Sequence, residues 1–166
     1  FNRVVEAVLE SYEDHGGINH IEGVNLPSRE VVIELLHDLQ EVLFPGYFSK
    51  NAVDSLNVRY VVGQRLARAF SRLTNEMAKA LRHHHMQNEN LDWTTEKCKE
   101  QAREIAMALM EEIPVIRELL REDAIAAYQG DPAAASVVDV ILSYPSIRSI
   151  SAYRIAHFLH QLNVPL

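Results

Sequence analysis

Asp131 is the residue whose type and setting point most directly to chemistry, because it stands between a glycine and a proline. A carboxylate before proline is typical of a helix start: its oxygen accepts an N–H of the first turn, and proline fills a position whose N–H has no partner. A carboxylate has two oxygens, so one can cap the helix while the other faces a ligand ammonium. Both roles stay open from the local sequence.

Tyr153, Arg154 and His157 interrupt the last apolar segment of the chain. At helical spacing, Arg154 and His157 continue a ridge that Ile147 and Ile150 begin. A buried arginine or histidine needs hydrogen-bond partners, so we expect these side chains to meet polar groups of a following segment or of another subunit. A hydrogen-bond network without a catalytic part is the alternative interpretation.

Three consecutive histidines, His83, His84 and His85, suggest a metal site at first sight. Consecutive helix residues point about 100° apart, however, so they cannot converge on one ion as ligands at i and i+4 can. We expect a solvated helix end whose imidazolium groups complement the helix dipole, and no metal site. A histidine-rich metal-binding bundle is a remaining alternative, and it would require a stoichiometric bound metal.

The composition limits the classes of partner. The chain has 166 residues, a formal net charge of −7 and 48% apolar residues, which suit one substantial core in one or two compact units. The excess of acidic residues argues against nucleic acid or an anionic membrane as a binding partner. The sequence shows neither a membrane-spanning run nor a signal peptide at its start, so we expect a cytoplasmic protein. Cys98 is the single cysteine, and we expect it to be a plain helix residue.

Almost every segment shows the helical period, which predicts an all-α bundle of about six to seven helices. N-cap residues, prolines and glycines divide the pattern into segments. The expected helices run from Ser28 to Pro45, from Val53 to about His85, from Asp92 or Thr94 to Glu112, from Pro114 to Tyr128, from Pro132 to Leu142 and from Ser146 to Leu162.

The stretch GDPAAASVVDVILSYPSIRSISAYRIAHFLHQLNVPL resembles the end of the α-helical N-terminal domain of bacterial serine O-acetyltransferases. In that family Asp-Pro-Ala, a Tyr-Pro-Gly or Leu-Lys-Gly turn, and Tyr- or His-Arg-Ile-x-His occur at this spacing, just before a left-handed parallel β-helix. The stretch LPSREVVIELLHDLQEVLFPGYF is similar to the longer N-terminal extension of one branch. Ser146 replaces the usual glycine and Ile147 an often aromatic residue, which leaves the turn geometry open.

The resemblance implies an enzyme that transfers the acetyl group of acetyl-CoA to L-serine for cysteine synthesis, with a β-helix histidine as general base. That histidine, the hexapeptide repeats of the β-helix and the acetyl-CoA groove are not in this sequence. We therefore expect residues 1–166 to be the N-terminal helical domain, with 1–50 as the branch extension, within a longer protein. The chain begins with Phe1 rather than methionine, which fits that expectation. A non-catalytic helical assembly module is the alternative.

The resemblance to serine O-acetyltransferases implies a role for only a few residues of this chain. Asp131 matches the aspartate that contacts the bound amino acid and the inhibitor cysteine, and its carboxylate would hold the ligand ammonium. Tyr153, Arg154 and His157 match Tyr-Arg-Ile-x-His and would support the junction with the β-helix. We expect no catalytic residue, metal ligand or cofactor in this domain. Expected partners are L-serine, acetyl-CoA, further copies of the chain in a trimer or dimer of trimers, and O-acetylserine sulfhydrylase through a C-terminal tail outside the chain.

Overall fold

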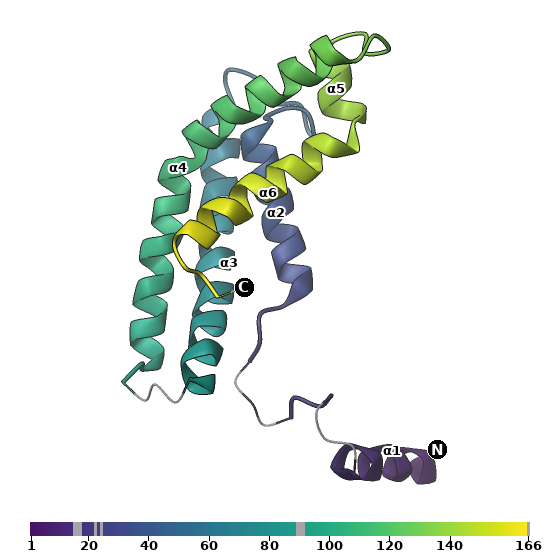
Figure 1. The fold of residues 1–166 in the computed structure, drawn as a ribbon, viewed down its shortest axis with the longest axis vertical. Coiled ribbons are helices and arrows are strands. Elements are labelled where there is room, and N and C mark those ends of the chain that lie inside the picture. Colours follow the sequence, from purple (N-terminus) through teal and green to yellow (C-terminus); the bar gives the residue numbers. More distant parts are fainter. Residues whose placement is uncertain (15–17, 22, 24, 89–91, 166) are drawn as a thin grey trace.

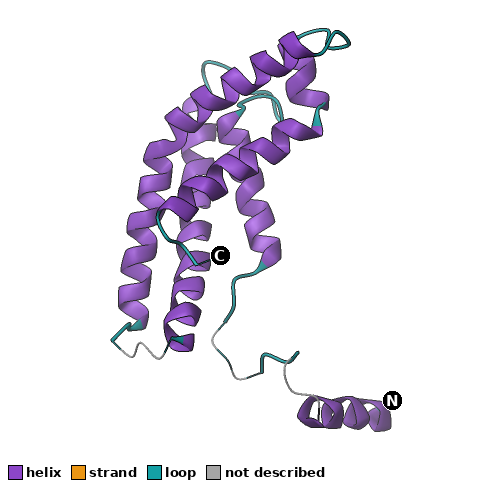
Figure 2. Ribbon diagram, viewed as in Figure 1, coloured by secondary structure: helices purple, strands orange, loops and turns teal. Residues whose placement is uncertain are grey.

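The computed structural model describes residues 1–14, 18–21, 23, 25–88 and 92–165. Over these residues the chain forms six helices and no strand, so the all-α prediction is confirmed (Figure 2). The helices are α1 (Asn2–Asp14), α2 (Arg29–Leu43), α3 (Val58–Gln87), α4 (Thr95–Gly130), α5 (Val137–Ser143) and α6 (Pro145–Gln161).

Short polar side chains set the helix starts. Ser28 caps α2, as predicted, by accepting a hydrogen bond from the N–H of Val31 at 3.4 Å. Thr94 caps α4 in the same way. The start predicted for α3 was five residues too early, because the Asp54 carboxylate accepts the N–H groups of Leu56 and Asn57 and holds this segment in a turn.

The segment from 92 to 130 differs from the prediction of two helices. Pro114 does not start a new helix but lies inside α4, which continues to Gly130. The core explains the continuity, since Ile113 and Ile116 are both buried on either side of the proline and hold the backbone in helical register. Figure 1 shows α4 bending along its length, and a proline within a helix is a common cause of such a bend.

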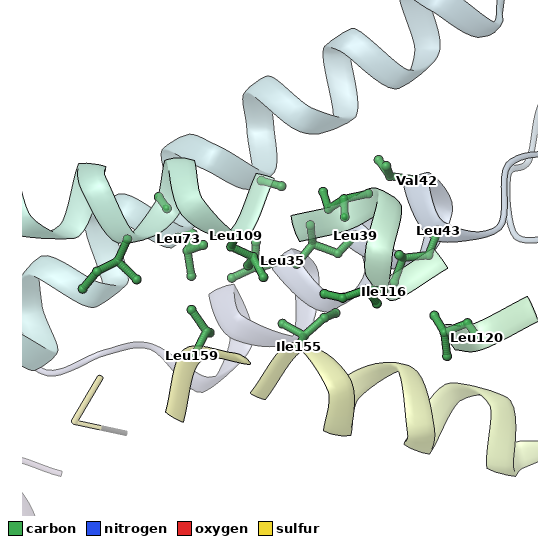
Figure 3. Packing of buried hydrophobic residues seen from close by; sticks show 14 of the residues in the cluster. Leu35, Leu39, Val42, Leu43, Leu73, Leu109, Ile116, Leu120, Ile155 and Leu159 are labelled. Carbon is green, nitrogen blue, oxygen red and sulfur yellow. The ribbon is translucent and has the colours of Figure 1, made fainter. Parts of the chain in front are cut away.

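The core lies where α2, α3, α4 and α6 pack together (Figure 3). Leu39, Leu109 and Leu120 are each at most 1% exposed. Cys98 belongs to this core, as expected of a plain helix residue, and burial raises the pKa of its thiol. The first helix, α1, lies apart from the other five (Figure 1). Its apolar residues are exposed, namely Val4, Val5, Val8, Leu9 and Tyr12.

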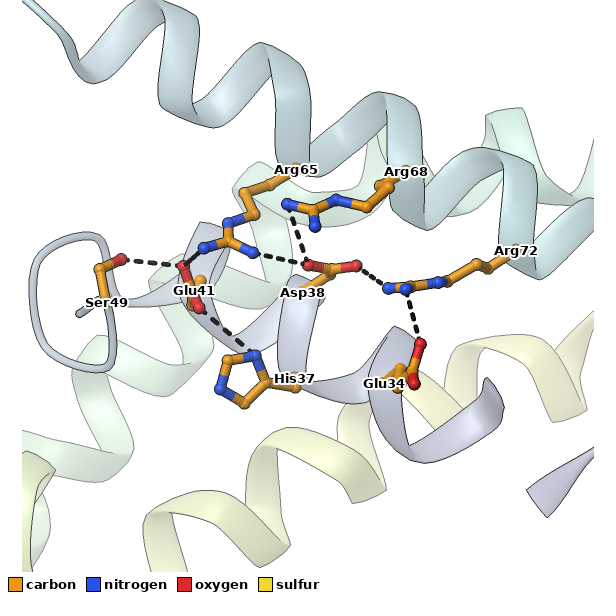
Figure 4. Close-up of polar contacts among 8 residues, drawn as sticks. All are labelled: Glu34, His37, Asp38, Glu41, Ser49, Arg65, Arg68 and Arg72. Atoms are coloured by element: carbon orange, nitrogen blue, oxygen red, sulfur yellow. Dashed lines mark hydrogen bonds and ion pairs between the residues drawn. The ribbon is translucent and has the colours of Figure 1, made fainter. Parts of the chain in front are cut away.

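An ion cluster joins α2 to α3 beside this core (Figure 4). The side chains of Asp38 and Glu41 are each 3% exposed. Arg65 bridges the two carboxylates at 3.0 Å and 2.5 Å, and Arg72 pairs with the other oxygen of Asp38. The remaining members are Glu34, His37, Ser49 and Arg68. Buried carboxylates need such partners, so the cluster fixes how α2 lies on α3.

Candidate functional site

Asp131 directly follows α4 and opens the turn that leads to α5. Its Oδ1 accepts a hydrogen bond from the N–H of Ala133 at 2.9 Å, and its carbonyl accepts one from Ala134 at 3.1 Å. The predicted helix from Pro132 was wrong, because α5 begins only at Val137, where Ser136 is the N-cap. Asp131 therefore stabilises a tight turn rather than a helix start. Its second oxygen, Oδ2, takes no part in these turn bonds.

The second oxygen of Asp131 is held by Tyr144, a residue that local sequence reasoning did not single out. The Tyr144 hydroxyl donates to Asp131 Oδ2 at 2.5 Å. Tyr144 occupies the single position between α5 and α6, so it links the turn after α4 to the start of α6. Two signals in the sequence could have identified it, namely its place just before Pro145 and its match to the tyrosine of the Tyr-Pro-Gly turn.

This hydrogen bond favours the ionised form of Asp131 and the neutral form of Tyr144. The bond from Tyr144, followed by the N–H of Ala133, holds the pKa of the Asp131 carboxyl below its usual value. The same bond raises the pKa of the Tyr144 phenol. At neutral pH the pair is therefore a carboxylate and a neutral phenol, which is the state needed to bind a cation.

A second carboxylate adds to the negative potential at this turn. Asp139, in the first turn of α5, accepts from the N–H of Ala135 at 3.4 Å and from the hydroxyl of Ser143 at 3.3 Å. Its charge is also the smallest of the causes that raise the pKa of Tyr144. Among the described residues no arginine, lysine or histidine forms an ion pair with Asp131 or Asp139. Each carboxylate oxygen has further acceptor positions, so the site can accept an ammonium group.

Arg154 braces α6 against α4 below this turn. Its Nε and Nη2 donate to the two carboxylate oxygens of Asp123, each at 2.8 Å. Within the described residues, the partner of Arg154 therefore lies on the preceding long helix of the same chain, as in the alternative of a hydrogen-bond network without a catalytic part. The bidentate geometry, in which planar guanidinium meets planar carboxylate, sets the position of α6 and so of Tyr144 at its head.

Comparisons with known proteins identify sequence relatives of the chain. No protein-family profile matches the sequence. The plasmid serine acetyltransferase of Synechococcus elongatus is 35% identical over 141 residues, which are 85% of this chain and 44% of the relative. A serine acetyltransferase of Bacillus licheniformis is 43% identical over 44 residues, covering 26% of this chain and 20% of that protein.

A solved structure extends the likeness from sequence to fold. Serine acetyltransferase isoform 3 of Entamoeba histolytica, in complex with cysteine, superposes with a TM-score of 0.59 at 26% identity, over 96% of this chain and 49% of that one. The chain is a relative of the serine acetyltransferases. It spans about half the length or less of these three relatives, namely 44%, 20% and 49%.

The other residues of the serine acetyltransferase motif do not meet Asp131. Tyr153 and His157 stack on each other with ring centroids 5.6 Å apart, and both are exposed on α6. The amide of Gln161 lies 3.2 Å from His157 Nε2. No hydrogen bond or ion pair joins Asp131 to Tyr153, Arg154 or His157 in the described part of the chain. These residues form a separate surface that the structure places along α6.

The departure from the serine acetyltransferase pattern at Ser146 has a simple structural account. Ser146 and Ile147 lie in the first turn of α6, after Pro145. Positive φ among described residues other than glycine occurs at Asn163 alone, so this turn does not require the conformation that glycine favours. Ile147 is 2% exposed and anchors the start of α6 in the core.

The histidine triplet lies at the end of α3, as predicted. His84 and His85 are in its last turn, where a positive charge complements the helix dipole. His85 stacks on Trp93 with ring centroids 4.0 Å apart. Burial, followed by the charge of His84, lowers the pKa of His85. Within the described ranges, no three histidine, cysteine, aspartate or glutamate side chains gather closely enough to hold one ion.

None of the described helices has the length and apolar character that a membrane span requires.

Proposed function

We propose that residues 1–166 form the helical amino-acid-binding and assembly domain of a serine O-acetyltransferase, which transfers the acetyl group of acetyl-CoA to L-serine in cysteine synthesis. The observation that carries the proposal is the Asp131 carboxylate, which hydrogen bonds from Tyr144 and Ala133 hold in a fixed orientation. Kinship with serine acetyltransferases supports it. The Entamoeba relative is in complex with cysteine, which has the same α-ammonium group as serine.

In this proposal Asp131 binds the substrate ammonium. A charge-assisted hydrogen bond of this kind contributes ~1.5–3 kcal/mol. Tyr144 orients the carboxylate, and Asp139 adds negative potential beside it. The ammonium is not a reacting group, so these residues position the serine hydroxyl rather than take part in proton transfer.

The reacting groups lie outside this chain in our proposal. A histidine of a β-helix domain takes the serine hydroxyl proton as the oxygen attacks the thioester carbonyl, and CoA leaves as the thiol. Acetyl-CoA binds to that domain as a co-substrate, and the helical domain holds no cofactor. We place the protein in the cytoplasm, where acetyl-CoA and serine are available to it.

Assembly is the second part of the proposed role. The exposed apolar residues of α1 lie away from the rest of the bundle and are suited to pack against a further copy of the chain. We propose a homo-oligomer, a trimer or a dimer of trimers. Tyr153, Arg154 and His157 would support the junction between α6 and the β-helix. O-acetylserine sulfhydrylase is a further proposed partner, through a tail beyond these residues.

The test is an assay of thiol release from acetyl-CoA in the presence of L-serine. The complete protein that contains this chain should turn over, whereas residues 1–166 alone should not exceed the buffer rate, because they lack the general base and the acetyl-CoA groove. Turnover by residues 1–166 would overturn the domain assignment. Inactivity of the complete protein, with its assembly intact, would show that the chain is a non-catalytic assembly module.

A further inference from the structure

A cavity of about 820 Å³ lies between the second half of α3, the start of α4 and the segment before α2. It is far from the Asp131 turn along the chain, and the proposed function makes no use of it. Its polar lining includes Asn25, Asn75, Glu76, Lys79, Arg82 and Lys99. This volume falls in the range of cavities that hold small organic ligands.

Helical spacing gathers the cations on facing surfaces of this cavity. Asn75, Lys79 and Arg82 follow one another at i, i+4 and i+7, so they share one face of α3. Lys99 lies in the second turn of α4, one turn after Thr95. Arg82 lines the same cavity as Thr95 and Lys99, so it lies beside the start of α4.

The single acid in this lining is already neutralised. Glu76 is 5% exposed, and its Oε2 accepts from the N–H of Ser28 at 2.6 Å. Its Oε1 pairs with Lys79 at 2.7 Å. Arg82 and Lys99, by contrast, form no ion pair with any residue that the structure describes. The cavity therefore has a surplus of positive charge, although the chain as a whole has a net charge of −7.

We propose that this cavity binds a small polyanion, a ligand with two or more phosphate or carboxylate groups. Arg82 and Lys99 supply the charges that hold it, and Asn25 and Asn75 supply amide donors. The cavity is larger than a single phosphate ion needs, and its cations come from two helices, so a ligand with separated anionic groups fits it best. The site is independent of the serine site.

Titration calorimetry with pyrophosphate and citrate tests the proposal, in buffer whose ionic strength is matched with chloride. Pyrophosphate represents phosphates and citrate represents carboxylates, so the preferred probe identifies the class of ligand. At least one should bind with 1:1 stoichiometry. Trp93 provides a second measurement, because it stacks on His85, the residue that precedes Met86 of the cavity lining. Its fluorescence should change with the same saturation curve.

The decisive variant is Arg82→Gln with Lys99→Gln, which should weaken binding roughly tenfold or more per side chain. Both residues are exposed, so the melting temperature should stay near that of the parent. The matched control is Arg59→Gln with Arg103→Gln, two exposed arginines on the same helices outside the cavity, and it should bind within about twofold of the parent. Absence of saturable binding to both probes, or an equal loss in the control, would overturn the proposal.

Discussion

The phenol oxygen of Tyr144 and Oδ2 of Asp131 lie 2.5 Å apart and join the turn after α4 to the head of α6. With the N–H of Ala133 on the other oxygen, the carboxylate has a fixed orientation and a lowered pKa before any ligand arrives. Arg154 and Asp123 hold α6 on α4 below this pair. A rigid carboxylate of this kind can bind an ammonium without first having to be ordered.

The variant Tyr144→Phe tests whether this hydrogen bond positions Asp131 for serine. It removes one hydrogen bond and keeps the ring, so the serine KM of the complete protein should rise roughly 2- to 12-fold. The KM for acetyl-CoA and the kcat should stay near the parent values. A purely structural role for Tyr144 would instead change the melting temperature and affect both substrates alike.

Tyr144→Phe should also change the pH dependence of serine binding. Binding of the ammonium needs ionised Asp131, so affinity is present above the pKa of this carboxyl and is lost as the pH falls through it. Tyr144 lowers that pKa, so Tyr144→Phe should raise it, and the loss of binding should begin at a higher pH. A carboxyl-carbon NMR titration of Asp131 in both proteins measures the shift directly. An unchanged titration would show that the bond does not set the charge state.

The lowered pKa of Asp131 also predicts how the stability of the fold depends on pH. A carboxyl whose folded pKa lies below its unfolded value stabilises the fold above the unfolded value, near pH ~3.9 for aspartate, and loses that contribution as the pH falls through the folded value. In Tyr144→Phe this contribution should shrink. Urea unfolding of both proteins at pH 7 and at acidic pH should therefore give a smaller difference between them at the acidic pH.

The carboxylates of the ion cluster between α2 and α3 should contribute unequally to the free energy of unfolding. Asp38→Ala should lower the free energy of unfolding by about 3 kcal/mol, because Arg65 and Arg72 lose the buried carboxylate they share. Glu34→Ala removes another partner of Arg72, but the Glu34 side chain is 60% exposed, so the loss should be below about 1 kcal/mol. Urea unfolding measures both values, and equal losses would contradict this account.

Self-association through α1 is expected because its apolar residues are exposed. Val5→Asp with Val8→Asp places two charges on that surface and should shift the protein to smaller species in sedimentation at micromolar concentration. The control is Glu6→Gln with Glu10→Gln, which changes the same helix but places no charge among its apolar residues. It should leave the distribution of sedimenting species unchanged. A parent protein that sediments as a monomer would count against the proposed assembly.

Local signals in the sequence predicted the helices well where capping chemistry decides the outcome. Ser28 and Thr94 each supply a side-chain oxygen to an unpaired N–H; Ser28 was predicted as a cap, and Thr94 was one of two starts left open, with Asp92. Pro114 misled the prediction, because proline is common in the first turn of a helix, whereas here it lies inside α4. The turn after Asp131 was misjudged because Asp131 bonds to Ala133 and Ala134 within a turn, and the N-cap of α5 is Ser136, five residues later.

The candidate site could be predicted only in part. Asp131 was identified by its neighbours and by resemblance, yet its two partners differ in kind: Ala133 is local, whereas Tyr144 reaches it through the packing of α5 and α6. Arg154 likewise meets Asp123 across a helix interface that no local spacing encodes. Long-range pairs of this kind follow from the tertiary fold, so a single sequence does not reveal them.

The most direct test of the proposed serine site is the serine KM of the complete protein with Asp131→Asn. Asparagine can still accept the N–H of Ala133 and bond to the Tyr144 oxygen, so the turn should survive while the negative charge is lost. Equal melting temperatures of parent and variant would confirm this. We predict a rise in the serine KM of roughly 10- to 150-fold, with the acetyl-CoA KM within about twofold and any inhibition by cysteine weakened in parallel. An unchanged serine KM would contradict the account, because Asp131 would then stabilise the turn and nothing more.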